Sequence, residues 1–574
     1  MNTMQKRLWS IVCAVAMLCA LLPTGLTATA QTEIWNGGTQ PFASGDGTAE
    51  NPYMIMNGAQ LAYLGKWILD GKATVGAYYK IGADIYLNDT TNWELWGTAD
   101  ANGNPIAPKN VWTPIGKALE VGTARPFKGY LDGGGHTIYG VYCDYLTRSE
   151  QNGLFAAAWD SEITDLHVAE STVIGKSSVG GIAGYFTGTM TSCSFRGTAI
   201  GYERVGGLIG SAGSSARVED CCNNGTVIGI EWNTSTASEG GIGGIVGASS
   251  GNGVYNCTNL GYVYSQNAAC SYVGGIVGKD SSWLVKNCKN RGYVSGYAYV
   301  GGISGNGTNI RYSYNSGLVE GYSDVGGIVG SGGAYYSYQV GVVSGVKYVG
   351  GIVGRANAQQ EIENCYNTGI VTGEIYVGGL AGSWRSEWHI KDSYNAGTVM
   401  GVLIEKENAN NIGGLAGSVG SPSHVVNCYN VGEVYCEAGT GITPTFNTIY
   451  SSSEGNSYYV DTGSDTKYFG TKITAEEATT LSTYVGFDKK IWTIGVAKSG
   501  YPAPTLIDVP HREPLLGNMD DNDTVNGMDA LLLYAYTSGE TELPVSSVLL
   551  MNVNGDDDIN TLDALLLYKA ISGE

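Results

Sequence analysis

The chain has 574 residues, a formal net charge of −21 and charged side chains at only 14% of its positions. This acidic balance excludes nucleic acid as a partner, because such a partner needs a basic face. Glycine, with 87 residues, lies far above its usual share of roughly 7%, and 43% hydrophobic residues exclude a disordered chain. Abundant Gly and Tyr together favour a mainly β protein of short strands and tight turns.

Residues 1–30 have the pattern of a secretory signal peptide. Lys6 and Arg7 precede an apolar run that ends at Leu22, and a small-residue cleavage site follows at Ala30. The run is short for a membrane span, and no later stretch reaches eighteen apolar residues. We therefore expect a secreted mature protein that has no membrane span after cleavage.

Residues 31–150 are expected to form an N-terminal cap and the first coils of a repeat domain. The apolar stretch from Ala59 to Leu69 predicts a short helix. Such a helix would cover the first coil, since an open strand edge invites pairing with another chain.

A glycine-rich hexapeptide, [VI]-G-G-[IL]-x-G, dominates residues 151–447. Its nine copies start at Val179, Val205, Ile242, Val273, Val300, Val325, Val349, Val377 and Ile412. Each unit is too small to bury an apolar face alone, whereas stacked units would share one core. The aliphatic positions should point inward, and the glycines should supply positive φ or close backbone approach. The repeat therefore predicts a β-solenoid, or β-helix.

A second element lies between the copies and is clearest at residues 364–373. One position in it holds Cys193, Cys221, Cys257, Cys288, Cys365 and Cys428, or else Ser313, Ser337 and Ser393. A position that accepts Cys or Ser requires a small buried residue, which favours stacked free thiols over disulfides. Two positions later, an asparagine is expected to bond along the stack, at Asn259, Asn290, Asn315, Asn367, Asn395 and Asn430.

The nine-copy repeat resembles the GLUG motif family, which occurs on bacterial surface and secreted proteins, and the resemblance covers roughly residues 151–440. The repeat is lost in residues 448–507, which are expected to form a C-terminal cap. Residues 508–514 contain two prolines and are expected to be a linker.

Residues 515–574 hold eight Asp, three Glu and one Lys, so their net charge is 1 − 8 − 3 = −10. Two twelve-residue loops, 518–529 and 552–563, each run into Ala-Leu-Leu-Leu-Tyr. Oxygen-bearing side chains fall at loop positions 1, 3, 5, 9 and 12, and position 7 would add a backbone carbonyl, as Ca²⁺ requires. The expected ligands are Asn518, Asp520, Asn522, Thr524, Asn526 and Asp529, then Asn552, Asn554, Asp556, Asp558, Asn560 and Asp563.

This loop pair, with Asp at position 12, resembles type I dockerins across residues 515–574. The resemblance implies a small α-helical module that binds two Ca²⁺ ions, folds with metal and docks onto a cohesin domain. Position 1 is Asn where Asp is usual, and position 6 is Asp523 or Asp557 where Gly is expected. The candidate cohesin contacts are Gly527, Met528, Tyr534, Ala535, Thr561, Leu562, Tyr568 and Lys569.

Four tyrosines lie just before hexapeptides, at Tyr272, Tyr299, Tyr348 and Tyr376. They either pack at the edge of the core or form a platform for sugar rings. Acidic residues inside the repeats are scattered, which favours solvated turn charges over paired catalytic carboxylates. We therefore assign no catalytic residue.

The sequence as a whole predicts a secreted, cohesin-docking subunit of a cellulosome-like or cell-surface complex. Its non-catalytic β-solenoid would bind polysaccharide or serve surface adhesion. The alternative is a polysaccharide-degrading enzyme, a lyase or glycoside hydrolase, with its active site on the β-helix. A dockerin fits both, because enzymes and binding modules carry it alike.

Overall fold

The computed structural model describes residues 33–506 except for a set of internal gaps. The gaps are 101–102, 117–124, 147–150, 231–237, 267–269, 281–283, 357–359, 386–388, 404–410, 420–424, 431, 439–444, 447–457, 461–470, 475, 485–488, 491 and 497–501. All described residues except Glu33 belong to one compact unit, Ile34–His511. The expected signal peptide, linker and dockerin lie outside them.

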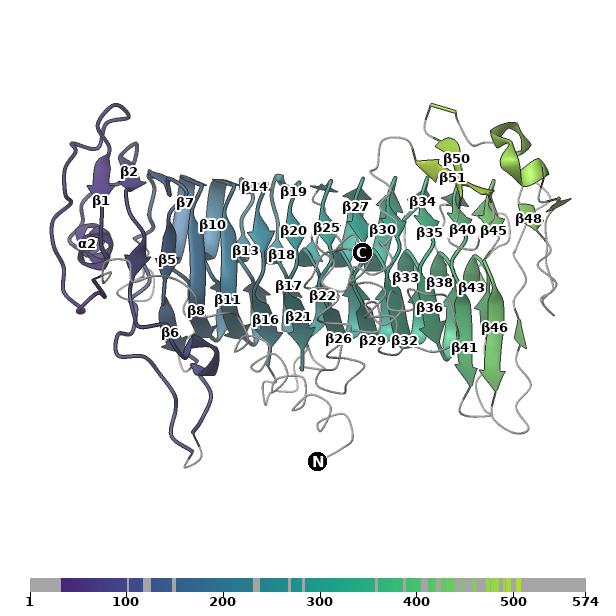
Figure 1. The fold of residues 1–574 in the computed structure, drawn as a ribbon, viewed down its shortest axis with the longest axis horizontal. Coiled ribbons are helices and arrows are strands. Elements are labelled where there is room, and N and C mark those ends of the chain that lie inside the picture. The colour runs from purple at the N-terminus through teal and green to yellow at the C-terminus, as the bar shows by residue number, and fades with distance from the viewer. Residues whose placement is uncertain are drawn as a thin grey trace, which may run out of the picture. The chain divides into compact units, whose positions relative to one another are not determined.

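A helical cap covers the N-terminal end of this unit, as the sequence predicts. Helix α2 (Gly58–Leu69) begins at Asn57, whose side chain accepts a hydrogen bond from the Gln60 backbone N–H. Its Leu61, Leu64 and Ile68 are buried and join the main core. The helix lies at the end of the strand stack (Figure 1). The first coil behind it begins with parallel pairing of β1 (Tyr53–Ile55) and β2 (Tyr78–Ile81).

Each following coil contributes up to five short strands, some of them joined into longer ones, and equivalent strands of successive coils pair in parallel (Figure 1). Three sets recur in every coil that carries the hexapeptide. The first set ends on the hexapeptide: β9 (Ser177–Gly180), β12 (Glu203–Gly206), β17 (Ser238–Gly243), β22 (Cys270–Gly274), β26 (Val294–Gly301), β29 (Val319–Gly326), β32 (Val342–Gly350), β37 (Ile375–Gly378) and β42 (Asn411–Gly413). The second set begins within it: β10 (Ala183–Thr191), β13 (Ile209–Ala212), β18 (Val246–Ser249), β23 (Val277–Asp280), β27 (Ser304–Arg311), β30 (Val329–Tyr335), β33 (Val353–Ala356), β38 (Ala381–Trp384) and β43 (Ala416–Val419). The third set follows the Cys or Ser position: β11 (Ser194–Gly201), β15 (Cys222–Asn223), β20 (Thr258–Asn259), β25 (Lys289–Asn290), β28 (Tyr314–Asn315), β31 (Tyr338–Gln339), β35 (Tyr366–Asn367), β40 (Tyr394–Asn395) and β45 (Tyr429–Asn430).

The two large sheets that result have 19 and 30 strands, and one continuous core fills the space between them. The aliphatic hexapeptide positions are fully buried in it, as at Val325 and Ile328. This architecture confirms the predicted mainly β solenoid, and the residue types explain it because no single coil could bury these side chains alone.

The hexapeptide glycines permit close backbone contact. A Cβ on Gly326 would lie 2.1 Å from the Val329 carbonyl oxygen, and one on Gly327 would lie 2.1 Å from the Gly351 oxygen of the next coil. The alternative expectation, positive φ at these glycines, is wrong: left-handed backbone falls instead on Asn, Asp, Ser and Tyr at the coil corners. Short polar side chains tolerate that conformation best.

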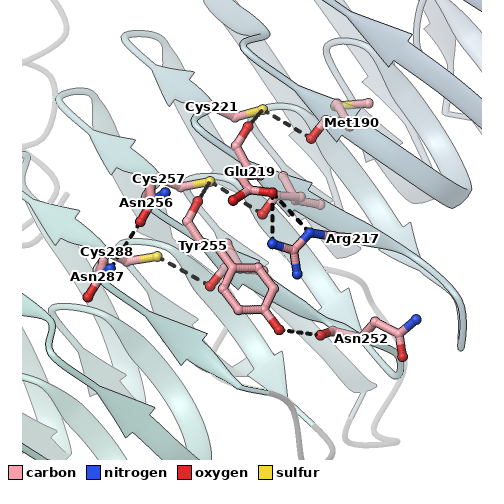
Figure 2. A network of polar contacts seen from close by, with 12 residues as sticks. Met190, Arg217, Glu219, Cys221, Asn252, Tyr255, Asn256, Cys257, Asn287 and Cys288 are labelled. Atoms are coloured by element: carbon pink, nitrogen blue, oxygen red, sulfur yellow. Dashed lines mark hydrogen bonds and ion pairs between the residues drawn. The ribbon is translucent and has the colours of Figure 1, made fainter.

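The cysteine position forms a buried column of free thiols, as the packing argument predicts. Figure 2 shows Cys221, Cys257 and Cys288 on successive coils. The Cys257 thiol donates to the Tyr255 carbonyl oxygen at 3.2 Å, and the Ser313 hydroxyl donates to the Arg311 carbonyl at 2.9 Å. Cys and Ser therefore interchange here because both satisfy the carbonyl two residues earlier.

The asparagine ladder is also present. The Asn259 side chain donates to Asn290 Oδ1 at 2.7 Å, and Asn290 donates to Asn315 Oδ1 at 2.6 Å. Asn367, Asn395 and Asn430 continue the pattern with bonds of 2.8 Å. Asn259, Asn290, Asn367 and Asn395 thus each bond their own turn and the asparagine of the next coil, and Asn430 ends this series.

The described part of residues 448–507 continues the stack and also packs along one side of the solenoid. β48 (Tyr458–Val460) pairs in parallel with β45, and β49 (Thr471–Ile473) pairs with β48. Tyr484 and Trp492 join a second core with the buried tyrosines of β28, β31, β35, β40 and β45. Trp492 Nε1 donates to Asn364 Oδ1 at 2.9 Å, and the hairpin of β50 (Trp492–Val496) and β51 (Pro502–Leu506) lies over this side (Figure 1). This segment therefore shields the buried tyrosines of β28, β31, β35, β40 and β45 from solvent.

Candidate ligand-binding surface

The four predicted tyrosines lie in one corner column, at the ends of β22, β26, β32 and β37, and all are half-buried. They form two face-to-face pairs. The rings of Tyr272 and Tyr299 are 5.1 Å apart at 22°, and those of Tyr348 and Tyr376 are 5.2 Å apart at 6°. Because each ring covers its neighbour's face, a ligand would meet mainly ring edges. Of the two alternatives from the sequence, this arrangement is nearer to packing at the edge of the core than to a broad platform for sugar rings.

The backbone at this corner does not favour tyrosine. Tyr299, Tyr348 and Tyr376 have φ values of 48°, 56° and 58°. A bulky residue in the left-handed region carries strain on the order of 1 kcal/mol. Asn364 and Asn427, at another corner of the coil, show the less strained choice. The tyrosine rings, and not the backbone, therefore account for the residue type here.

Asp324 interrupts the tyrosine column between the two ring pairs and is only 2% exposed. Arg355, on β33, reaches back into this interval and forms an ion pair with the Asp324 carboxylate. Its guanidinium lies 5.8 Å from the Tyr299 ring and 4.8 Å from the Tyr348 ring, and Nη2 donates to the Tyr299 hydroxyl at 3.2 Å. The Arg355 guanidinium thus lies between the Tyr299 and Tyr348 rings, at the level where Asp324 replaces a tyrosine.

The Asp324 carboxyl depends on this partner. Burial raises its pKa above the ordinary value, while the hydrogen bond from Ser323 and the charge of Arg355 pull the pKa down less strongly. Loss of Arg355 would therefore lead Asp324 to bind a proton instead of keeping an unpaired buried charge.

Two lysines complete the corner. Lys279 Nζ lies 5.1 Å from the Tyr272 ring and Lys347 Nζ lies 4.9 Å from the Tyr348 ring. Both side chains are half-buried, so each ammonium combines a cation–π contact with access to solvent. We call this set of residues the cationic corner. It comprises the four tyrosines, Asp324, Lys279, Lys347 and Arg355.

Strand pairing sets a polar column beside the tyrosines. Its members occupy paired positions on β23, β27, β30, β33 and β38 and are Lys279, Asn306, Ser331, Arg355 and Ser383. Ser331 and Ser383 are buried, whereas Lys279, Asn306 and Arg355 are partly exposed. The three exposed members are hydrogen-bond donors of the kind that carbohydrate and carboxylate oxygens accept.

The sequence analysis identified the tyrosines but missed Lys279, Lys347, Arg355 and Asp324. A signal for two of them exists, because Lys279 and Arg355 each directly follow a hexapeptide and so share one register. The interlocking of Arg355 with Asp324 across coils could not be read from spacing alone.

The structure also brings together carboxylates that appeared scattered in the sequence. Glu361 and Glu363 both contact Lys391 Nζ at 3.1 Å. Partial burial lowers the pKa of Lys391, but the hydrogen bonds that it donates to both glutamates, together with their negative charges, outweigh this effect and raise the pKa overall. This lysine stays protonated and its single charge is shared by both carboxylates, so the cluster suits an ion-pair role better than proton transfer.

The proposed calcium ligands in loops 518–529 and 552–563, and the cohesin contacts beside them, lie outside the described residues. Within the described residues, no three His, Cys, Asp or Glu side chains gather as a metal site. Nor does any described helix combine the length and apolarity needed to cross a membrane.

No family model matches the chain. A stretch of 181 residues, 31% of the chain, is 30% identical to halomucin from Haloquadratum walsbyi (strain DSM 16790 / HBSQ001), but covers only 2% of that protein. A solved structure from Bacteroides ovatus, provisionally named an immunoglobulin A1 protease, matches 80% of this chain and 94% of its own. The identity is 18% and the TM-score 0.32, so neither comparison assigns a family or a function.

Proposed function

We propose that the chain is an exported, non-catalytic polysaccharide-binding subunit, which attaches through its C-terminal calcium loops to a cohesin domain in a cellulosome-like or cell-surface complex. The cationic corner is the observation that carries the binding part. Three tyrosines hold strained backbone there, and three cations and a polar column lie beside them. Amphipathic rings combined with hydrogen-bond donors suit sugar recognition.

Export and attachment are supported by sequence. The signal-peptide pattern of residues 1–30 directs the chain out of the cell. The two loops repeat the same oxygen positions and lead into the same apolar segment, which a merely acidic tail would not require. Calcium would order the module and present its helices to cohesin.

The enzyme alternative receives less support from the described residues. A glycoside hydrolase requires one free acid and one free base across the scissile bond. Glu361 and Glu363 instead share the Lys391 ammonium. A lyase requires a base that loses its proton, and the raised pKa of Lys391 opposes that role.

The test is affinity electrophoresis of the full mature chain in gels that contain plant and host polysaccharides, with product release measured in parallel. The triple variant Tyr299→Asn/Tyr348→Asn/Tyr376→Asn removes three rings with a residue that tolerates positive φ. Its retention should be lost. Tyr312→Asn/Tyr336→Asn is the matched control, since those rings are also stacked, 4.9 Å apart, at φ values of 51° and 50°.

Retention of the wild type and the control, but not of the triple variant, with no product released, supports the proposal. Equal retention of the triple variant with its fold intact would contradict binding at the corner. Steady release of oligosaccharides would establish the enzyme alternative.

A further inference from the structure

The charge of the cationic corner is opposite to that of the chain around it. The whole chain carries −21, yet the corner holds three cations, Lys279, Lys347 and Arg355. Lys347 and Arg355 lie beside the buried carboxylate of Asp324, and Lys279 lies further along the column. Two further acids are near: Asp280 directly follows Lys279, and Glu374 precedes Ile375, the register partner of Lys347. Asp280 and Asp324 are buried, at 4% and 2% exposed, whereas all three cations are partly exposed. Partly exposed cations beside aromatic rings, with the aspartates buried beneath them, point to an anionic ligand.

We propose that the polysaccharide bound at the cationic corner is a polyanion with carboxylates on its sugars, that is, a uronate-containing polymer, and that Lys279, Lys347 and Arg355 select it. This inference rests on the proposed polysaccharide binding and specifies its chemical class.

Arg355 retains donors for such a ligand. Of its five N–H groups, one on Nε faces Asp324 and one on Nη2 is used by the Tyr299 hydroxyl. Its side chain is 24% exposed, so solvent reaches the part that the corner leaves uncovered. A guanidinium fixed between two rings loses little conformational entropy on binding a carboxylate, which its planar fork matches.

The cations also recur along the solenoid axis. Lys279 belongs to the coil of Val273, whereas Arg355 and Lys347 belong to the coil of Val349, three coils further on. At roughly 4.8 Å per coil, the two ends lie about 14 Å apart. A single small anion cannot span that distance, whereas a polymer with a carboxylate on successive sugars can meet both ends.

The test compares polymers that differ only in charge. The full mature chain is run in affinity gels that contain polygalacturonate or hyaluronate, and in gels that contain the methyl-esterified form of each. We expect retardation by an acid form, at least severalfold weaker retardation by its ester, and weakening with added salt, since exposed charges are screened.

The variant is Lys279→Met/Lys347→Met, which keeps each side chain's packing on its ring because a thioether also favours aromatic contacts. Apparent affinity for the acid polymer should fall roughly fivefold, given two exposed charge contacts of modest strength. The matched control is Lys286→Met, because Lys286 lies 5.4 Å from the Tyr312 ring at a different corner. It should bind as the wild type does.

Each outcome decides the matter. Equal retention by acid and ester would overturn the anionic class while leaving polysaccharide binding intact, whereas no retention on any polymer, charged or neutral, would overturn both. An equal loss in Lys286→Met, or equal retention on DNA, would show diffuse charge attraction and contradict selection at the corner. Loss confined to the double lysine variant on the acid polymer supports the proposal.

Discussion

The asparagine ladder makes a quantitative prediction about what holds the coils together. Asn290 is fully buried and makes three side-chain hydrogen bonds. It accepts one from Asn259 at 2.7 Å and donates two, to the Gly292 carbonyl at 3.0 Å and to Asn315 at 2.6 Å. Asn290→Ala removes all three bonds and strands their partners in a dry interior.

At a net value of about 1 kcal/mol per hydrogen bond, the loss should be about 3 kcal/mol, and more where a stranded partner finds no water. Asn430 offers an internal comparison, since only two such bonds join it, from Asn395 at 2.8 Å and to the Gly432 carbonyl at 3.1 Å. Asn430→Ala should therefore cost about 2 kcal/mol.

Hydrogen exchange measured by mass spectrometry is the suitable assay, because a repeat array need not unfold in one step. Opening free energies should fall in peptides that contain β25 and β28. Asn306→Ala, on the outer surface, should change them by less than about 0.5 kcal/mol. An Asn290→Ala variant within that same margin, or an Asn430→Ala variant that costs more than Asn290→Ala, would refute the ladder as a source of stability.

Further predictions concern the core and the flank. Burial raises the pKa of the Cys365 thiol from 9.0 to about 12, so the folded state keeps a proton that the unfolded state releases, and stability should fall as pH rises from about 9 to 12. Cys365→Ser should flatten that decline in urea titrations; an unchanged pH slope would contradict it. Gly302→Ala places a Cβ 2.1 Å from the Gly327 oxygen and should unfold nearby coils, seen as lost exchange protection. Gly65→Ala, in helix α2, meets only Ile115 Cγ1 at 3.8 Å and should leave that protection unchanged. Trp492→Ala removes the hydrogen bond to Asn364 and should lower the free energy that holds residues 481–496 against the solenoid by about 3 kcal/mol. Hydrogen-exchange protection should drop in residues 481–496 but stay in β32 and β37.

The fold was predictable because the same residue types recur at the same places. The hexapeptide, the Cys or Ser position and the asparagine two residues later each became a column in the stack. The position of residues 473–496 was not predictable, because Tyr484 and Trp492 pack against the solenoid side through contacts that are distant in sequence. Trp492, for example, bonds Asn364, which lies 128 residues earlier. Nor was the face-to-face stacking of the corner tyrosines, which depends on coil spacing and ring orientation.

For the candidate site, sequence identified the rings but not the charges between them. Arg355 contacts Tyr299, 56 residues earlier, and Asp324. Irregular insertions change the interval between coils, so such pairs emerge only once the register is fixed. The calcium ligands, by contrast, are local in sequence, which is why the loop pattern can be proposed without a fold.

Attachment through calcium is the claim on which the proposed role turns. The direct measurement is isothermal titration of the metal-free, full mature chain with Ca²⁺. We expect two ions per chain, one ion after Asp563→Ala, and still two after Asp521→Ala, which removes an acid outside the proposed ligand set. No uptake by the wild type, or the same stoichiometry in Asp563→Ala, would contradict calcium-dependent docking.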